Sequence, residues 1–268
     1  MHLRTRNSNM MQIFILSGFA LKHVLEHCVT KPYVIVIQHD RTLMRPTPIA
    51  EVVNAMVRHP NIKYVGMSMR SNLLYRDIFL SKYGRQFMDD MKACTLRLPE
   101  LALDASIYGP DRTGHVGDPN DAKLQKSLDG LAENYFRTHQ FNEHKEWVKH
   151  NACDEADGKE HKLKLSQLTL YPVFFWYDNI HICDTKHYRD FIFNPKYKMV
   201  KRGGFVEDKV SPVIRKTVER FGLVEGHSRF GCYLLDDASG YFFTGHYDGG
   251  AYVIEEDRAD MIQDSNKK

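Results

Sequence analysis

Three polar residues follow directly on an apolar run near the start of the chain. Tyr33 to Ile37 are aromatic and aliphatic, and Gln38, His39 and Asp40 come next. Such a run predicts a strand buried on both faces, with Asp40 at its carboxyl end. Ligands of open α/β sheets collect at the carboxyl ends of parallel strands, where a carboxylate suits a hydrated divalent cation. An Asp after a strand also commonly forms a turn or caps a helix, so Asp40 alone leaves both interpretations open.

A second candidate site combines glycines with acids. Gly203 and Gly204 precede Glu207 and Asp208, and we place a helix start just after them, at residues 211–212. Two adjacent glycines let the backbone approach a ligand closely. The acids belong either to a site or to the positive end of the helix, and the glycine pair favours the site.

Aromatic residues next to a carboxylate form a third candidate. Trp176, Tyr177 and Asp178 end an apolar run that begins at residue 168, which we interpret as a strand. Rings followed by polar groups are typical of sugar sites, because a ring packs on the apolar face of a sugar while polar groups bind its hydroxyls. A core strand that ends in a polar turn fits the same residues equally well.

The fourth candidate is a histidine late in the chain. The apolar runs 230–235 and 241–244 predict a β-hairpin, and His246 follows Gly245 at the end of its second strand. A histidine there is accessible and free to bind a metal. A single histidine is a weak signal, so His246 gains weight only together with the other candidates.

Helices and strands alternate around these residues. Helical spacing of apolar residues predicts helices over 17–30 and 49–57, and strands are expected at 33–40 and 62–69. This alternation is typical of a parallel α/β sheet. We divide the chain into a frayed end (1–16), a single α/β domain (17–256) with a polar insertion at about 100–164, and a polar tail (257–268).

Composition excludes several other classes of protein. The 268 residues are 43% hydrophobic and 26% charged, which is enough to form a full core. A net charge of +3 with interspersed signs predicts no nucleic-acid-binding face. The five cysteines are far apart, which argues against a zinc site. No apolar run is long enough to span a bilayer, and we find no signal peptide or anchor in the chain.

Taken together, the candidate segments resemble the nucleotide-sugar-dependent glycosyltransferases of the GT-A fold, especially the family 2-like members. Residues 37–40 lie where that family carries its Asp-x-Asp metal motif. Residues 204–208 are similar to its Gly-x-x-Glu-Asp segment, and His246 is similar to its late metal-binding histidine. The resemblance covers residues 17–252.

The resemblance implies a mixed, mostly parallel sheet flanked by helices, with a C-terminal β-hairpin. It also implies inverting transfer of a sugar from a nucleoside-diphosphate donor to a hydroxyl of a glycan or other acceptor, with Mn²⁺ or Mg²⁺ bound by Asp40 and His246. His39 is a further candidate metal ligand. Asp208 would be the general base and Glu207 would orient the acceptor. The remaining expected contacts are Gln38, Arg41 and Arg45 with the ribose or diphosphate, and Trp176, Tyr177, Asp178, Gly203 and Gly204 with substrate.

Two departures from the family pattern leave alternatives open. Gln38 stands where the family has Asp, and only 32 residues precede Tyr33, whereas one βαβ unit takes about 30 or more. Either the chain is N-terminally truncated, or another chain or an unusual site holds the nucleobase, so we expect incomplete nucleotide binding by these 268 residues. One alternative is an inactive domain that binds carbohydrate or a partner chain.

A non-haem iron oxygenase is less favoured, because adjacent His39 and Asp40 in an extended strand point to opposite faces. The sequence does not decide the compartment. The Golgi lumen fits if an upstream segment is missing, and the cytoplasm fits otherwise.

Overall fold

The computed structural model describes residues 11–14, 18–38, 41–43, 45–69, 75–103, 168–200, 205–237 and 243–246. The main sheet has the strand order β1-β2-β6-β4-β7-β5, and a separate ribbon pairs β3 with β8. The proposed insertion lies largely outside these residues, as does the C-terminal tail. The strands are β1 (Met11–Phe14), β2 (Tyr33–Val36), β3 (Arg41–Leu43), β4 (Tyr64–Met67), β5 (Thr169–Pro172), β6 (His181–Asp184), β7 (Cys232–Asp236) and β8 (Thr244–His246).

The main sheet is mixed, as expected, but it is not mostly parallel. The pairs β1–β2 and β4–β7 are parallel, whereas β2–β6, β4–β6 and β5–β7 are antiparallel. The expectation of a parallel majority is wrong because β6 lies between β2 and β4 and runs opposite to both. The strands β1, β2, β4 and β7 therefore share one direction.

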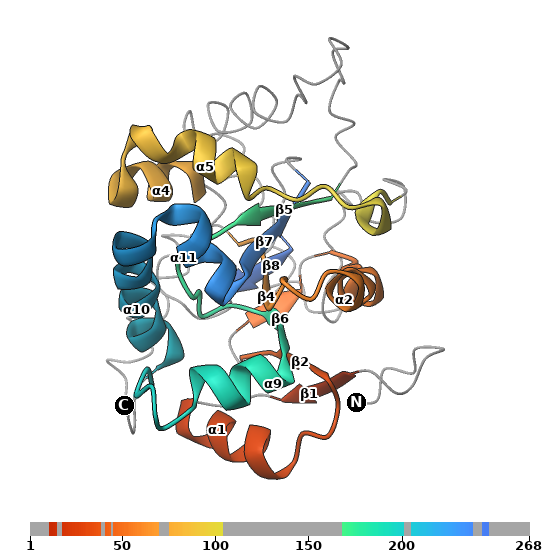
Figure 1. Cartoon of the computed structure of the whole chain (residues 1–268). Coiled ribbons are helices and arrows are strands. Elements are labelled where there is room, and N and C mark those ends of the chain that lie inside the picture. The colour runs from red at the N-terminus through yellow and green to blue at the C-terminus, as the bar shows by residue number, and fades with distance from the viewer. Residues whose placement is uncertain are drawn as a thin grey trace, which may run out of the picture.

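Helices cover both faces of the main sheet (Figure 1). Helix α2 lies on one face, and α1, α10 and α11 lie on the other. The described helices are α1 (Gly18–His27), α2 (Ile49–Arg58), α4 (Tyr75–Tyr83), α5 (Met88–Ala93), α9 (Thr185–His187), α10 (Val206–Phe221) and α11 (Leu223–Phe230). Shorter turns are the 3₁₀ helices η1 (Arg85–Phe87) and η2 (Pro99–Leu101) and the π-helical turn η3 (Tyr188–Ile192).

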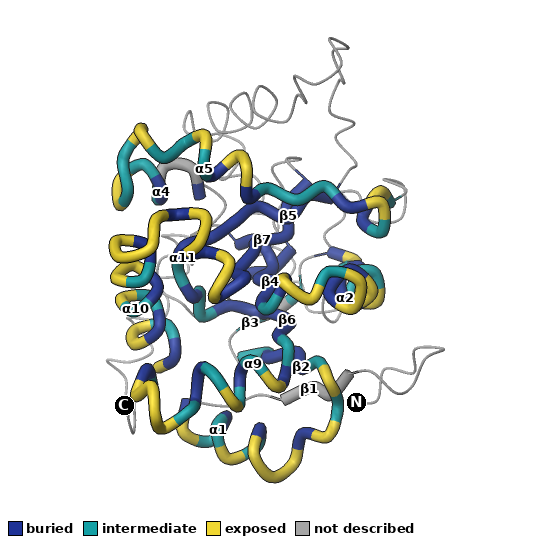
Figure 2. The backbone as a smooth tube through the Cα atoms, viewed as in Figure 1, coloured by how far each residue is buried: buried dark blue, intermediate teal, exposed yellow. Residues whose placement is uncertain are grey.

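Strand β2 is buried on both faces, as its apolar run predicts. Val34 and Val36 pack in the core beneath α1 and α10, whereas Ile35 points to the opposite core, against α2. This alternation follows from the two-residue period of a strand. Figure 2 shows the central strands buried and the outer faces of α2 and α10 exposed.

One βαβ unit ends at strand β2, with β1 and α1 in the stretch before residue 33 that the sequence analysis considers too short for the nucleotide-binding units of the GT-A fold. Strand β1, helix α1 and strand β2 form such a unit, because β1 pairs with β2 in parallel and α1 connects them. The sequence analysis assigns residues 11–14 to a frayed end. In the structure they are the edge strand of the sheet.

The prediction of a C-terminal β-hairpin is also wrong. Strand β7 lies inside the main sheet between β4 and β5, and β8 pairs with β3 instead of with β7. Helix α10 begins at Val206 and contains Pro212, so it starts earlier than residues 211–212. Glu207 and Asp208 consequently lie in its first turn and not before it.

The strand directions bring several chain segments to one edge of the sheet, the one formed by the carboxyl ends of its parallel strands. Strands β2, β4 and β7 all end there, and β6 begins there, since His181 pairs with both Val36 and Gly66. Residues that follow β2 and β7, and residues that precede β6, therefore meet at this edge. It is the edge where α/β sheets usually bind ligands.

Candidate functional site

The β3–β8 ribbon brings two distant candidates into register. In this antiparallel pair Arg41 lies directly opposite His246, although 204 residues separate them along the chain. Asp40 is bonded to Arg41 but lies outside the described residues, as does the side chain of His246. The ribbon therefore pairs the backbone of the predicted histidine with the residue next to the predicted Asp ligand.

The ribbon is fixed to the carboxyl end of β4. The Ser68 carbonyl accepts hydrogen bonds from the backbone N–H groups of Phe243 and Thr244, at 2.9 and 3.0 Å. The Thr244 hydroxyl donates to the same carbonyl at 3.2 Å. All three residues are buried, so the start of β8 is held against the main sheet.

Arg45 is part of the protein core. Its guanidinium forms a 2.8 Å ion pair with Asp237, and the two side chains are only 2% and 3% exposed. The guanidinium also stacks over the Phe243 ring, 3.7 Å from its centroid. Arg45 therefore joins the ribbon to the end of β7, and a diphosphate has no access to it in this structure.

Arg41 joins the end of β2 to the connection between β5 and β6. Its Nε donates to Gln38 Oε1 at 3.1 Å, and its Nη2 donates to the Asp178 carbonyl, also at 3.1 Å. Arg41, Gln38 and Asp178 are all partly exposed. This arrangement brings three predicted site residues from two separate segments together.

Glu207 completes this cluster from the first turn of α10. Its Oε2 accepts a 2.9 Å hydrogen bond from the backbone N–H of Asp178. Partial burial raises the pKa of the Glu207 carboxyl. The Asp178 N–H and the Arg41 charge act in the opposite direction, and the nearby carboxylates of Asp178 and Asp208 raise it further. Glu207 is thus a carboxylate that accepts a proton more readily than an exposed glutamate does.

Asp208 lies beside Glu207 and differs from it in exposure. Its side chain faces solvent at the start of α10, and an acceptor molecule could reach it from outside. The N-cap residue of this helix, Phe205, makes no side-chain capping hydrogen bond. Because both acids lie in the first turn, they also interact with the positive end of the helix dipole. The structure is compatible with either interpretation of the two acids.

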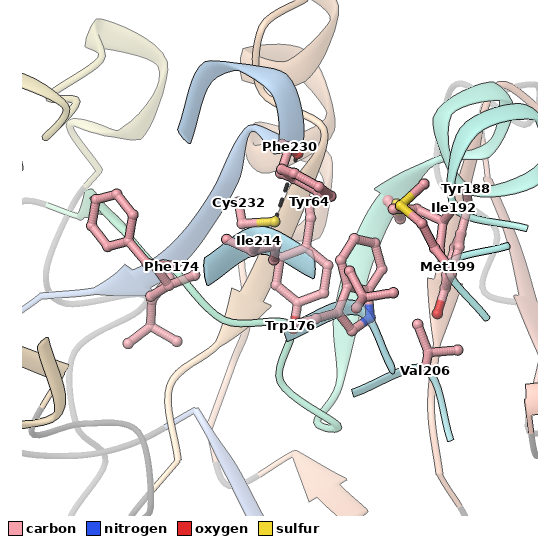
Figure 3. Close-up of a cluster of buried hydrophobic side chains, with 14 of the residues drawn as sticks. Tyr64, Phe174, Trp176, Tyr188, Ile192, Met199, Val206, Ile214, Phe230 and Cys232 are labelled. Carbon is pink, nitrogen blue, oxygen red and sulfur yellow. Dashed lines mark hydrogen bonds between the residues drawn. The ribbon is translucent and has the colours of Figure 1, made fainter. Parts of the chain in front are cut away.

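Trp176 does not offer the exposed aromatic ring that the sequence analysis expects for a sugar. The indole is 1% exposed and lies between Tyr64 and Tyr188, with ring centroids 4.7 and 5.1 Å away (Figure 3). No face of this ring is left for a sugar. Tyr177 is partly exposed, and burial of its hydroxyl raises its pKa, as does the nearby Glu207 charge.

The predicted metal site is only partly covered by the structure. His39, Asp40, Gly203 and Gly204 lie outside the described residues, so their roles stay predictions. Within the ranges that the structure describes, no three or more His, Cys, Asp or Glu side chains gather in a group that could hold a metal ion.

Two residues of this region were not among the sequence candidates. Tyr64 donates a hydrogen bond that its hydroxyl shares between the Tyr177 carbonyl and Asn179 Oδ1, at 2.9 and 2.8 Å. A signal for Tyr64 existed in Gly66, because a glycine inside a strand often marks a close approach. Asn179 directly follows Asp178, which the sequence analysis did select.

Comparison of the chain with protein-family models, with curated proteins and with solved structures finds no match. Across the part of the chain that the structure describes, no helix is both long and apolar enough to cross a membrane.

Proposed function

We propose that this protein is a metal-dependent glycosyltransferase that moves a sugar, with inversion, from a nucleoside-diphosphate donor to an acceptor hydroxyl. The observation that carries the proposal is the convergence of four segments at the carboxyl edge of the sheet. Gln38 and Arg41, Asp178, Glu207 and the backbone of His246 meet there through the contacts given above. These segments carry three of the sequence motifs that resemble the GT-A enzymes.

Four of the described candidates have a role in this proposal. Asp208, which is exposed, removes the proton from the acceptor hydroxyl as it attacks the sugar. Glu207, fixed by the Asp178 N–H, orients the acceptor. Gln38 follows β2 and Arg41 begins β3, and their amide and charged guanidinium suit the ribose and the diphosphate of the donor.

A metal ion fits the chemistry of the candidate ligands. Asp40 offers a carboxylate and His246 an imidazole, with His39 as a third candidate, and Mn²⁺ accepts such a mixed set. The ribbon register pairs Arg41, the residue next to Asp40, with the backbone of His246, so the two chain segments that carry these candidate ligands lie side by side. When bound, the ion would neutralise the charge that builds up on the leaving diphosphate.

A binding domain without turnover is the second candidate, and two observations favour it. Arg45 is held in a buried ion pair, and Trp176 is enclosed in the core, so neither is available to a substrate. Such a domain would bind a glycan or a partner chain but would release no nucleotide.

Release of nucleoside diphosphate from UDP- and GDP-sugars, with Mn²⁺ and an acceptor mixture, tests the proposal. We expect Asp208→Asn to lower turnover by about 100-fold or more, because the proton acceptor is lost. Asp89→Asn is a matched control, since Asp89 is also an exposed acid in the first turn of a helix. If turnover is unchanged in both Asp208→Asn and Asp89→Asn, the role of Asp208 is refuted. Binding of glycan without nucleotide release would favour the second candidate.

A further inference from the structure

The peptide groups of Asp178 connect two proposed site residues. Its N–H donates to Glu207 Oε2 at 2.9 Å, and its carbonyl accepts from Arg41 Nη2 at 3.1 Å. The positions of Glu207 and Arg41 relative to each other therefore depend on the orientation of this one residue.

The neighbouring residues on both sides of Asp178 are fixed to strand β4. The Tyr64 hydroxyl bonds the Tyr177 carbonyl and Asn179 Oδ1, and Asn179 Nδ2 donates to the Met67 carbonyl at 2.6 Å. The Met67 N–H donates in turn to the Ile180 carbonyl at 2.9 Å. Tyr64 and Asn179 are both 0% exposed, so water does not compete for these bonds.

Strand β4 is shaped for this contact. Gly66 follows Tyr64 by two residues and lies on the same face, and a Cβ there would meet the Tyr64 hydroxyl at 3.0 Å and Asn179 Oδ1 at 3.3 Å. The missing side chain at position 66 is what lets the Tyr64 hydroxyl reach the 177–179 segment. His181 contacts the same segment: its Nδ1 lies 2.7 Å from the Asn179 carbonyl, and its ring stacks on Tyr64.

We propose that Tyr64 is a positioning residue that sets Glu207 and Arg41 in place by fixing the peptide groups of Asp178. Its contribution to sugar transfer rests on the proposed function, whereas its effect on Glu207 does not. The Tyr64 hydroxyl donates a hydrogen bond to the Tyr177 carbonyl. The N–H of the same peptide group, that of Asp178, donates to the Glu207 carboxylate, so the hydroxyl acts on Glu207 through this one peptide group.

The test compares two tyrosines that make the same kind of bond. Tyr64→Phe removes the hydroxyl that holds the Tyr177 carbonyl. Tyr83→Phe removes a hydroxyl that donates to the Phe174 carbonyl at 3.2 Å, in the same connection but away from Asp178. Both variants are titrated by NMR at the labelled Glu207 carboxyl, and the hydrogen exchange of the Asp178 amide is measured in parallel.

We expect Tyr64→Phe to raise the pKa of Glu207 by about 0.5 to 1, because a weakened N–H bond stabilises its charged form less. The Asp178 amide should exchange about tenfold faster or more. Tyr83→Phe should leave both readouts at their wild-type values. Where wild-type turnover is present, Tyr64→Phe should also lower kcat by about tenfold.

A folded Tyr64→Phe protein with unchanged Glu207 titration and Asp178 exchange would overturn the proposal, as would equal changes in Tyr83→Phe. If Tyr64→Phe does not fold, Gly66→Ala takes its place, since the added methyl displaces the hydroxyl without removing it, and the same two shifts are expected. An unaltered Glu207 in Gly66→Ala would also overturn it. Wild-type protein without turnover would refute the proposed function, and the NMR readouts would still decide the role of Tyr64.

Discussion

The ion pair between Arg45 and Asp237 should dominate the stability of the β3–β8 ribbon. Replacing Arg45 with Met keeps the apolar stem but leaves the Asp237 carboxylate buried without this cation. Both side chains are at most 3% exposed, so solvent cannot compensate for the loss. Because the pair joins the ribbon to the end of β7, the same change should loosen the strand that carries His246.

The expected magnitude follows from the burial of the pair. Breaking a buried ion pair by removing one partner costs about 3–5 kcal/mol, because the remaining charge is left desolvated. Loss of the stacking on Phe243, 3.7 Å away, adds about 1 kcal/mol. We therefore expect Arg45→Met to lower the free energy of unfolding by about 4–6 kcal/mol. The double variant Arg45→Met with Asp237→Leu should recover most of this loss, since it removes both charges of the pair and leaves neither partner buried alone.

Urea unfolding followed by circular dichroism measures these differences. Arg215→Met is the matched control, because the Arg215–Glu219 pair has a similar 3.0 Å contact but side chains that are 55% and 57% exposed. This control should lose about 0.5 kcal/mol or less. A loss of under about 1.5 kcal/mol for Arg45→Met, or a double variant no more stable than the single one, would refute this reasoning.

Two further predictions concern buried histidines and a helix end. Burial lowers the pKa of His181 and of His227 to about 4, although hydrogen bonds to the Asn179 and Cys232 carbonyls oppose this effect. The unfolded chain therefore binds protons first as the pH falls below about 6.5, and each ring should cost about 2 kcal/mol of stability by pH 5. Urea unfolding at pH 7.5 and pH 5 measures this loss, and rings that titrate near pH 6.5 in NMR spectra of the folded protein would contradict it. Gly231→Ala should lower the free energy of unfolding by about 2–5 kcal/mol, since Gly231 has φ of 54° and an added Cβ would lie 2.1 Å from the Asn61 carbonyl oxygen. Gly222→Ala, at φ of 83° and ψ of 166° with open space around it, should cost about 1–3 kcal/mol from backbone strain alone in the same unfolding experiment, and equal losses would show that the contact with Asn61 is unimportant.

Local patterns predicted the elements whose signals are local. The helices at α1 and α2 and the strands at β2 and β4 follow from apolar spacing, and the structure confirms them. The sequence also pointed to Gln38, Arg41, Asp178 and Glu207, which the structure brings together. Their roles in catalysis stay predictions.

Features that depend on distant contacts were beyond these patterns. The apolar run of β7 and the short strand β8 suit any strand partner, so the sequence could not show that β8 pairs with β3. An aromatic residue looks the same in a core as in a sugar site, and only the packing of Tyr64 and Tyr188 shows that Trp176 is covered. Pro212 suggested a helix start, but α10 continues through it.

Calorimetric titration of UDP and GDP into the protein, with Mn²⁺ and with EDTA, tests the central claim most directly. The account predicts binding of one nucleotide that requires Mn²⁺ and that is lost in both Asp40→Ala and His246→Ala. The absence of nucleotide binding under every condition, or binding that both variants and EDTA leave unchanged, would contradict it.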